Sequence, residues 1–143
     1  MKILLVDPGT KSTGLAVWEK GAKTTWTART DPKDELHHRL KTIVASASLY
    51  APYDLVIMEA WERQFNPNMR YLIGALHIVE ASHIMLVSPR KWVTELGVKG
   101  KNSEQTKRRT MTLAKKKHWD PETQHEADAG CLYEWWKKTQ SNG

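Results

Sequence analysis

Short apolar runs and longer stretches of mixed polarity alternate along the chain. Ile3–Val6 is entirely apolar, and Asp54–Met58 contains a second such run, as in strands that are buried on both faces. Between Asp34 and Leu49 the apolar residues instead recur every three or four positions, which is the spacing of one face of a helix. The pattern therefore predicts a protein that combines strands and helices.

The same pattern predicts the order of the elements. Strands are expected at residues 3–6, 14–18, 24–30, 54–58 and 84–87, and helices at 34–49, 67–82, 91–96, from 102 onward, and at about 123–138. Lys20–Gly21 is typical of a hairpin turn, so the first three strands should run antiparallel to one another. Because the later strands alternate with helices, we expect an α/β fold with a central mixed five-stranded sheet flanked by helices.

Composition and charge indicate the kind of partner that the protein binds and its location in the cell. The 143 residues fit one domain, and a formal net charge of +6 favours an anionic partner, although a soluble protein with surplus lysines would carry the same charge. Cys131 is the sole cysteine, which excludes a disulfide within the chain, and the apolar run before Asp7 is too short for a signal peptide. No apolar run approaches the roughly 20 residues of a membrane helix. We therefore expect a cytoplasmic protein with no membrane partner.

Two carboxylates end buried strands. Asp7 follows the first apolar run, and Glu59 follows the run at residues 54–58. If these strands are neighbours in the sheet, the two carboxylates lie side by side, and their repulsion favours a hard cation such as Mg²⁺ between them. For either acid alone, capping a turn is the alternative interpretation.

A second polar group begins the last predicted helix. Thr123 and Glu126 have the spacing of a capping box, with Thr123 as the N-cap. His125 and Asp128 are three residues apart and share a helix face that apolar residues continue. Acids near a helix N-terminus are also favoured by the helix dipole, which explains Glu126 better than Asp128. His125 and Asp128 are therefore further candidate metal ligands.

These segments resemble the motifs of a known nuclease family, in the same order along the chain. Val6–Thr10 leading into Thr13–Val17 resembles the first motif of the RuvC-type Holliday junction resolvases. Leu55–Ala60 resembles the second motif, with Ile73–Ala75 at a family-like distance downstream, and His125–Ala129 resembles the closing motif. The resemblance covers nearly the whole chain, which is shorter than the usual bacterial members.

The resemblance implies a single RuvC-like nuclease domain over residues 1–143 with an RNase H-like fold. It implies a homodimer that resolves four-way DNA junctions by paired symmetric nicks. It also implies two Mg²⁺ or Mn²⁺ ions per active site, with Asp7, Glu59, His125 and Asp128 as metal ligands and catalytic residues. Asp7 would bridge the ions, Glu59 and Asp128 would each help to hold one, and His125 would ligate an ion or orient water. Many relatives have Asp at the position of His125. Because the imidazole of His125 offers a softer nitrogen ligand than a carboxylate, we expect it to favour Mn²⁺ over Mg²⁺.

DNA contacts are expected from the basic helix and from the loop that follows Glu59. The cations predicted to contact phosphates are Lys101, Lys107, Arg108 and Arg109, for which a solvated basic face is the alternative. The loop contains Trp61, Arg63 and Phe65. In relatives an aromatic residue of this loop wedges into the junction centre, and the spacing does not choose between Trp61 and Phe65.

Other interpretations remain open at this stage. Asp7–Thr10 with Thr13–Gly14 also resembles the phosphate-binding hairpin of actin-like ATPases and sugar kinases, which need two such domains. A non-catalytic junction-binding protein and an RNA-processing nuclease of the YqgF type are further alternatives. The helix predicted at residues 67–82 has two apolar stripes, so it faces either the sheet and a partner subunit or two layers of its own subunit.

Overall fold

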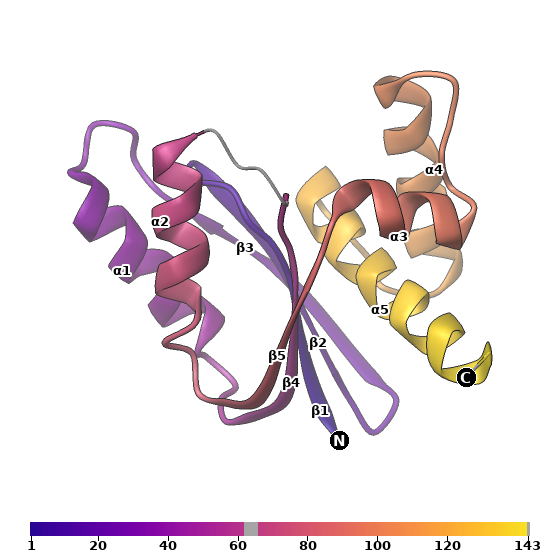
Figure 1. The fold of residues 1–143 in the computed structure, drawn as a ribbon, viewed down its shortest axis with the longest axis horizontal. Helices are drawn as coiled ribbons and strands as arrows, with labels where there is room; N and C mark the ends of the chain where they lie inside the picture. The colour runs from indigo at the N-terminus through magenta and orange to yellow at the C-terminus, as the bar shows by residue number, and fades with distance from the viewer. Residues whose placement is uncertain (62–65, 143) are drawn as a thin grey trace.

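In the computed structural model, which describes residues 1–61 and 66–142, a mixed five-stranded sheet runs through the centre of the protein (Figure 1). The strands are β1 (Lys2–Asp7), β2 (Ser12–Glu19), β3 (Ala22–Arg29), β4 (Tyr53–Glu59) and β5 (Ala81–Val87). Their order in the sheet is β3-β2-β1-β4-β5. The pairs β1–β2 and β2–β3 are antiparallel, whereas β1–β4 and β4–β5 are parallel. The predicted α/β fold with a mixed sheet is confirmed.

Helices cover both faces of the sheet. The helices are α1 (Leu36–Ala47), α2 (Pro67–Leu76), α3 (Pro89–Leu96), α4 (Ser103–Lys116) and α5 (Gln124–Asn142). α1 and α2 lie on one face, whereas α5 lies on the other with α3 and α4 packed beside it (Figure 1). The first helix is shorter at both ends than the predicted 34–49, and the last extends past residue 138. In the described part of the chain, none of the helices has the length and apolar character needed to span a bilayer.

The alternation of side chains along the strands determines where the strand-end carboxylates point. Even-numbered apolar residues of β1 belong to the core under α1 and α2, and odd-numbered ones belong to the core under α5. Asp7 continues the odd-numbered series. On β4, Ile57 belongs to the core under α5, and Glu59 lies two residues further along the same strand. Both carboxylates are therefore directed to the α5 face.

The second helix is shorter than its hydrophobic pattern predicts. α2 ends at Leu76 and β5 begins at Ala81, so the prediction of a helix up to Ser82 is wrong at its C-terminal end. The apolar spacing continues through Val79, but the N–H of Val79 donates to the carbonyl of Leu76 in a turn. Ala81 then pairs with Tyr53 of β4. Strand pairing with a distant segment therefore overrides the local helical pattern.

The beginning of α5 packs directly on the backbone of β2. A Cβ added at Gly14 would lie 2.2 Å from the carbonyl oxygen of His125, which no side chain tolerates. Glycine at this position lets the helix approach closely enough for its first turn to reach the ends of β1 and β4.

Candidate active site

Asp7 and Glu59 lie at the ends of adjacent parallel strands. β1 and β4 are paired up to Val6 and Met58, so the next residue on each strand is one of the two acids. Asp7 is buried, and its charge contributes to the raised pKa of Glu59, so the two carboxyl groups interact. The predicted side-by-side placement of the two acids is confirmed.

Burial and mutual repulsion shift the protonation of this pair. Burial raises the pKa of Asp7, against which its hydrogen bond to His125 acts. Burial, followed by the charge of Asp7, raises the pKa of Glu59 to about 8. Burial and the neighbouring charge therefore favour the protonated form of Glu59 when no cation is bound.

The first turn of α5 brings His125 to Asp7. His125 Nδ1 lies 2.7 Å from Asp7 Oδ2, and the imidazole ring is about half exposed. The hydrogen bond to Asp7 raises the pKa of His125, and the positive charge of Lys107 acts in the opposite direction. His125 therefore connects the strand-end acids to the surface.

The predicted capping box at this turn is formed in part. The N–H of Glu126 donates to the Thr123 hydroxyl at 3.1 Å, as a capping box requires. The Glu126 carboxylate accepts from the backbone N–H of Glu122 and from the hydroxyl of Thr27. Glu126 is buried, so its carboxylate anchors the start of α5 to β3.

Asp128 lies near the strand-end acids, one turn further along α5. Gln124 Nε2 donates to Asp128 Oδ1 at 2.9 Å and to the Thr110 hydroxyl at 2.6 Å, which joins α5 to α4. Burial, followed by the charge of Asp7, raises the pKa of Asp128 to about 6. The charge of Asp128 also contributes to the raised pKa of Glu59. The structure thus brings together all four predicted ligands.

The spacing of the four ligands is wider than a compact single-ion cluster. Among the described residues, three ligand atoms of His, Cys, Asp or Glu lie within 4.8 Å of one another in the exposed group Glu35, His37 and His38 at the start of α1. The four residues of the candidate site are not drawn together to that extent.

Trp92 is a neighbour of the site that the sequence reasoning missed. Its indole Nε1 donates to Glu59 Oε2 at 2.7 Å, and the side chain is buried in the core under α5. The two residues are 33 positions apart, so no local spacing predicts this contact.

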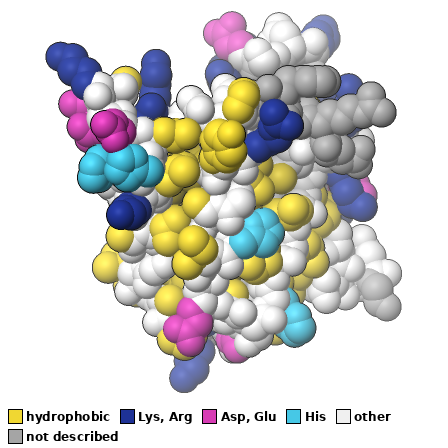
Figure 2. All heavy atoms as spheres, turned by 60° about the vertical axis from the view of Figure 1, so that its left-hand side comes forward, with side chains coloured by type: hydrophobic (Ala, Val, Ile, Leu, Met, Phe, Trp, Pro, Cys, Tyr) yellow, Lys and Arg dark blue, Asp and Glu magenta, His cyan; other side chains and the backbone are white. Residues whose placement is uncertain are grey.

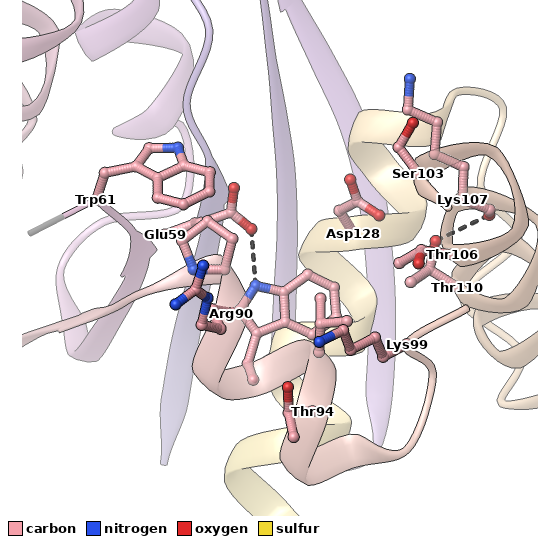
Figure 3. A pocket seen from close by; sticks show the side chains of 13 residues that line it. Glu59, Trp61, Arg90, Thr94, Lys99, Ser103, Thr106, Lys107, Thr110 and Asp128 are labelled. Atoms are coloured by element: carbon pink, nitrogen blue, oxygen red, sulfur yellow. Dashed lines mark hydrogen bonds between the residues drawn. The ribbon is translucent and has the colours of Figure 1, made fainter. Parts of the chain in front are cut away.

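A groove of about 480 Å³ opens beside Glu59 and Asp128, between α3 and α4 (Figure 3). Figure 3 shows Glu59 and Trp61 on one side and side chains of α4 on the other, with Asp128 between them. The polar residues that line the groove are Arg90, Thr94, Lys99, Ser103, Thr106, Lys107 and Thr110. On α4 these fall at positions 103, 106, 107 and 110, the spacing of one helix face, which was available as a signal in the sequence.

The predicted DNA-contacting residues are divided between this groove and other surfaces. Lys107 and the exposed Trp61 line the groove. Arg108 and Arg109 line a separate hollow, and Arg109 donates to the backbone carbonyl of Lys99 at 2.6 Å.

The remaining predicted contacts lie elsewhere. Lys101 is exposed and lines neither the groove nor the separate hollow. The predicted contacts Arg63 and Phe65 lie outside the described residues, while Arg90 and Lys99 line the groove although they were not predicted as contacts.

Comparison with known proteins relates this geometry to solved structures. No protein-family model matches the chain, and no curated protein matches its sequence. RuvC of Thermus thermophilus is similar in structure with a TM-score of 0.68 and 18% sequence identity, over 98% of this chain and 97% of that chain. T. thermophilus RuvC in complex with a Holliday junction substrate gives a TM-score of 0.66 and 16% identity, over 97% of this chain and 96% of that chain. The Holliday junction resolvase of fowlpox virus is similar in structure with a TM-score of 0.60 and 15% sequence identity, over 99% of this chain and 99% of that chain. The chain therefore has the RNase H-like fold of the RuvC-type resolvases.

Proposed function

We propose that this protein is a metal-dependent endonuclease that resolves four-way DNA junctions. The observation that carries the proposal is the convergence of Asp7, Glu59, His125 and Asp128 at one end of the sheet. The similarity to resolvase structures over nearly the whole chain supports it, including similarity to a RuvC bound to a Holliday junction. Fold similarity by itself does not define an activity, so the site chemistry has to carry the argument.

The donor set fits a hard divalent cation. Three carboxyl groups and one imidazole converge, and oxygen ligands are those that Mg²⁺ and Mn²⁺ prefer. The carboxyl pKa values are raised because burial and neighbouring negative charge oppose ionisation, which a divalent cation would relieve. In the proposed arrangement Asp7, Glu59 and Asp128 would hold the ions, and His125 would ligate one of them or orient water. Bound ions would lower the pKa of a water and neutralise charge on the scissile phosphate.

The protein's own residues position the DNA strand beside this site. Arg90, Lys99 and Lys107 supply positive charge along the groove, where backbone phosphates would bind. Trp61 is 54% exposed at the groove, so its ring is accessible for stacking on an unpaired base. His125 is half exposed and faces Asp7 through Nδ1, so its other ring nitrogen would either ligate an ion or orient water.

A second copy of the chain would complete a resolvase with two nicking sites. The α2 stripe formed by Leu72 and Leu76 is buried against the sheet, whereas Tyr71 is 60% exposed and Ile78 is 75% exposed. Figure 2 shows apolar side chains gathered on the side of the molecule that carries α1 and α2. We propose that this face forms a two-fold symmetric homodimer, since one junction needs two symmetric cuts.

Cleavage of a synthetic junction tests the proposal. A labelled four-way junction and a matching linear duplex are incubated with the protein and Mg²⁺ or Mn²⁺, beside Asp7→Asn. We expect paired symmetric nicks in the junction alone, and loss of nicking with retained binding in the variant. Binding without nicks in either metal would instead identify a junction-binding protein, and cleavage of the linear duplex at the same rate would contradict junction selectivity.

A further inference from the structure

Trp92 is placed to fix the orientation of Glu59. Its indole N–H donates to Glu59 Oε2 at 2.7 Å, which is a short, charge-assisted length when the carboxyl is ionised. Trp92 is 2% exposed, so it cannot turn away to solvent without leaving the core. A donor fixed in the core therefore holds one oxygen of an acid that lies at the site.

The helix that carries Trp92 follows β5 directly and packs against α5. α3 begins directly after β5, and its N-cap Ser88 accepts the N–H of Lys91 at 3.2 Å. Two residues before Trp92, the same helix presents Arg90 to the groove. The direction of the indole is therefore set by its packing in the core under α5, which Ile57 of β4 also joins.

Two other tryptophans make the same kind of bond away from the site. Trp135 Nε1 donates to Glu95 Oε2 at 2.6 Å, and Trp119 Nε1 donates to Glu134 Oε2 at 3.2 Å. All three indoles belong to the core under α5. The bond of Trp92 differs from the other two in its acceptor, Glu59, which ends the strand paired with the one that ends in Asp7. Trp135 is the closer match in bond length.

We propose that Trp92 is a positioning residue that holds Glu59 in the orientation needed to ligate a divalent cation. The inference rests on the proposed function in that Glu59 is taken as a metal ligand. With Oε2 held by the indole, rotation of the carboxyl is restricted, and less conformational freedom is lost when an ion binds. Removing a hydrogen-bonded partner of a metal ligand typically lowers metal affinity or activity 10–100-fold. We therefore expect loss of the Trp92 indole to weaken metal binding about 10-fold.

Trp92→Phe and Trp135→Phe test the proposal as a matched pair. Each variant keeps a buried aromatic ring and removes one indole donor from a glutamate. Binding of Mn²⁺ to the DNA-free protein is measured by titration calorimetry. We expect the Mn²⁺ dissociation constant to rise about 10-fold in Trp92→Phe and to stay within twofold of wild type in Trp135→Phe. Equal affinities in the two variants would overturn the proposal.

A measurement on the wild-type protein covers the case in which Trp92→Phe does not fold. The indole ¹H–¹⁵N resonances are followed during a Mg²⁺ titration. We expect the Trp92 indole signal to shift with saturation while the Trp135 signal stays in place. A Trp92 signal that is unchanged at saturating Mg²⁺ would overturn the proposal.

Junction cleavage separates failure of this inference from failure of the proposed function. If the wild type binds Mn²⁺ with the expected loss in Trp92→Phe but cuts no junction, the positioning role is supported and the resolvase assignment fails. If the wild type cuts junctions and Trp92→Phe binds Mn²⁺ normally, the resolvase assignment is supported and the positioning role fails. If both hold, raising the Mn²⁺ concentration should restore part of the cleavage rate of Trp92→Phe.

Discussion

Replacing Glu59 with Gln removes the charge of a half-buried carboxyl while keeping its shape. The pKa of Glu59 is raised from 4.5 to about 8 by burial and by the charge of Asp7. The folded protein therefore keeps a proton that the unfolded chain releases between these two pH values. Because the folded state binds more protons there, the stability of the metal-free protein falls as pH rises through this window. Gln cannot ionise, so Glu59→Gln should escape that loss.

The size of the effect follows from the two pKa values. At about 1.4 kcal/mol per pH unit, the interval from 4.5 to about 8 sets an upper limit of about 5 kcal/mol above pH 8. Glu59 is only partly buried by surface area, so solvent screens part of this cost, and we expect roughly 2 kcal/mol. For a chain of this length that raises the melting temperature by about 6–8 °C. At pH 4.5, where Glu59 is protonated in the folded protein, the difference should shrink to about 1–2 °C.

Thermal unfolding in EDTA at pH 4.5 and pH 9 measures this difference directly. Glu95→Gln is the control, because Glu95 also accepts a tryptophan indole but its side chain is 45% exposed and pairs with Lys91. We expect the control to raise the melting temperature at pH 9 by less than Glu59→Gln does. A shift for Glu59→Gln that is equal at pH 4.5 and pH 9, or a lower melting temperature at pH 9, would refute the reasoning.

Three further predictions concern other parts of the molecule. Lys107→Ala should reduce the slope of log affinity for the junction against log salt concentration by about 1. Arg108→Ala, in the separate hollow, should leave this slope unchanged. Equal slopes in the two variants would contradict the proposal that the groove binds DNA phosphates. In cleavage assays His125→Asp should shift the metal preference from Mn²⁺ towards Mg²⁺, because it replaces a nitrogen ligand by oxygen, and an unchanged ratio of rates would count against this role. Gly14→Ala should destabilise the protein by about 3 kcal/mol in urea unfolding, because its Cβ would meet the His125 carbonyl oxygen at 2.2 Å; a wild-type midpoint would show that α5 moves away at little cost.

The acids of the site were predictable because their signal is local. Each of Asp7 and Glu59 interrupts an apolar run, and a strand buried on both faces has few reasons to end in a carboxylate. That the two acids lie side by side depended on β1 and β4 being neighbours, which the sequence left as a condition and the observed parallel pairing meets. His125 and Asp128 were recognised by the same local reasoning, on a helix face that is otherwise apolar.

The contacts that were not predicted depend on tertiary packing. Lys107, Arg108 and Arg109 are consecutive, and only the packing of α4 on α5 decides which of them faces the site. The bond from Trp92 to Glu59 joins residues that the chain separates by 33 positions. For the same reason, the end of α2 was misplaced, since the pairing of β5 with β4 is invisible to a local pattern.

The order of the four site residues along the chain has a consequence during protein synthesis. A nascent chain that has emerged from the ribosome through β4 can already pair β1 with β4, which places Asp7 beside Glu59. His125 and Asp128 arrive only with α5, whose first turn must then dock on β2. Until α5 emerges, a growing polypeptide presents two acids without their partners. The proposed set of four ligands is therefore completed only after α5 has been synthesised and has docked on β2.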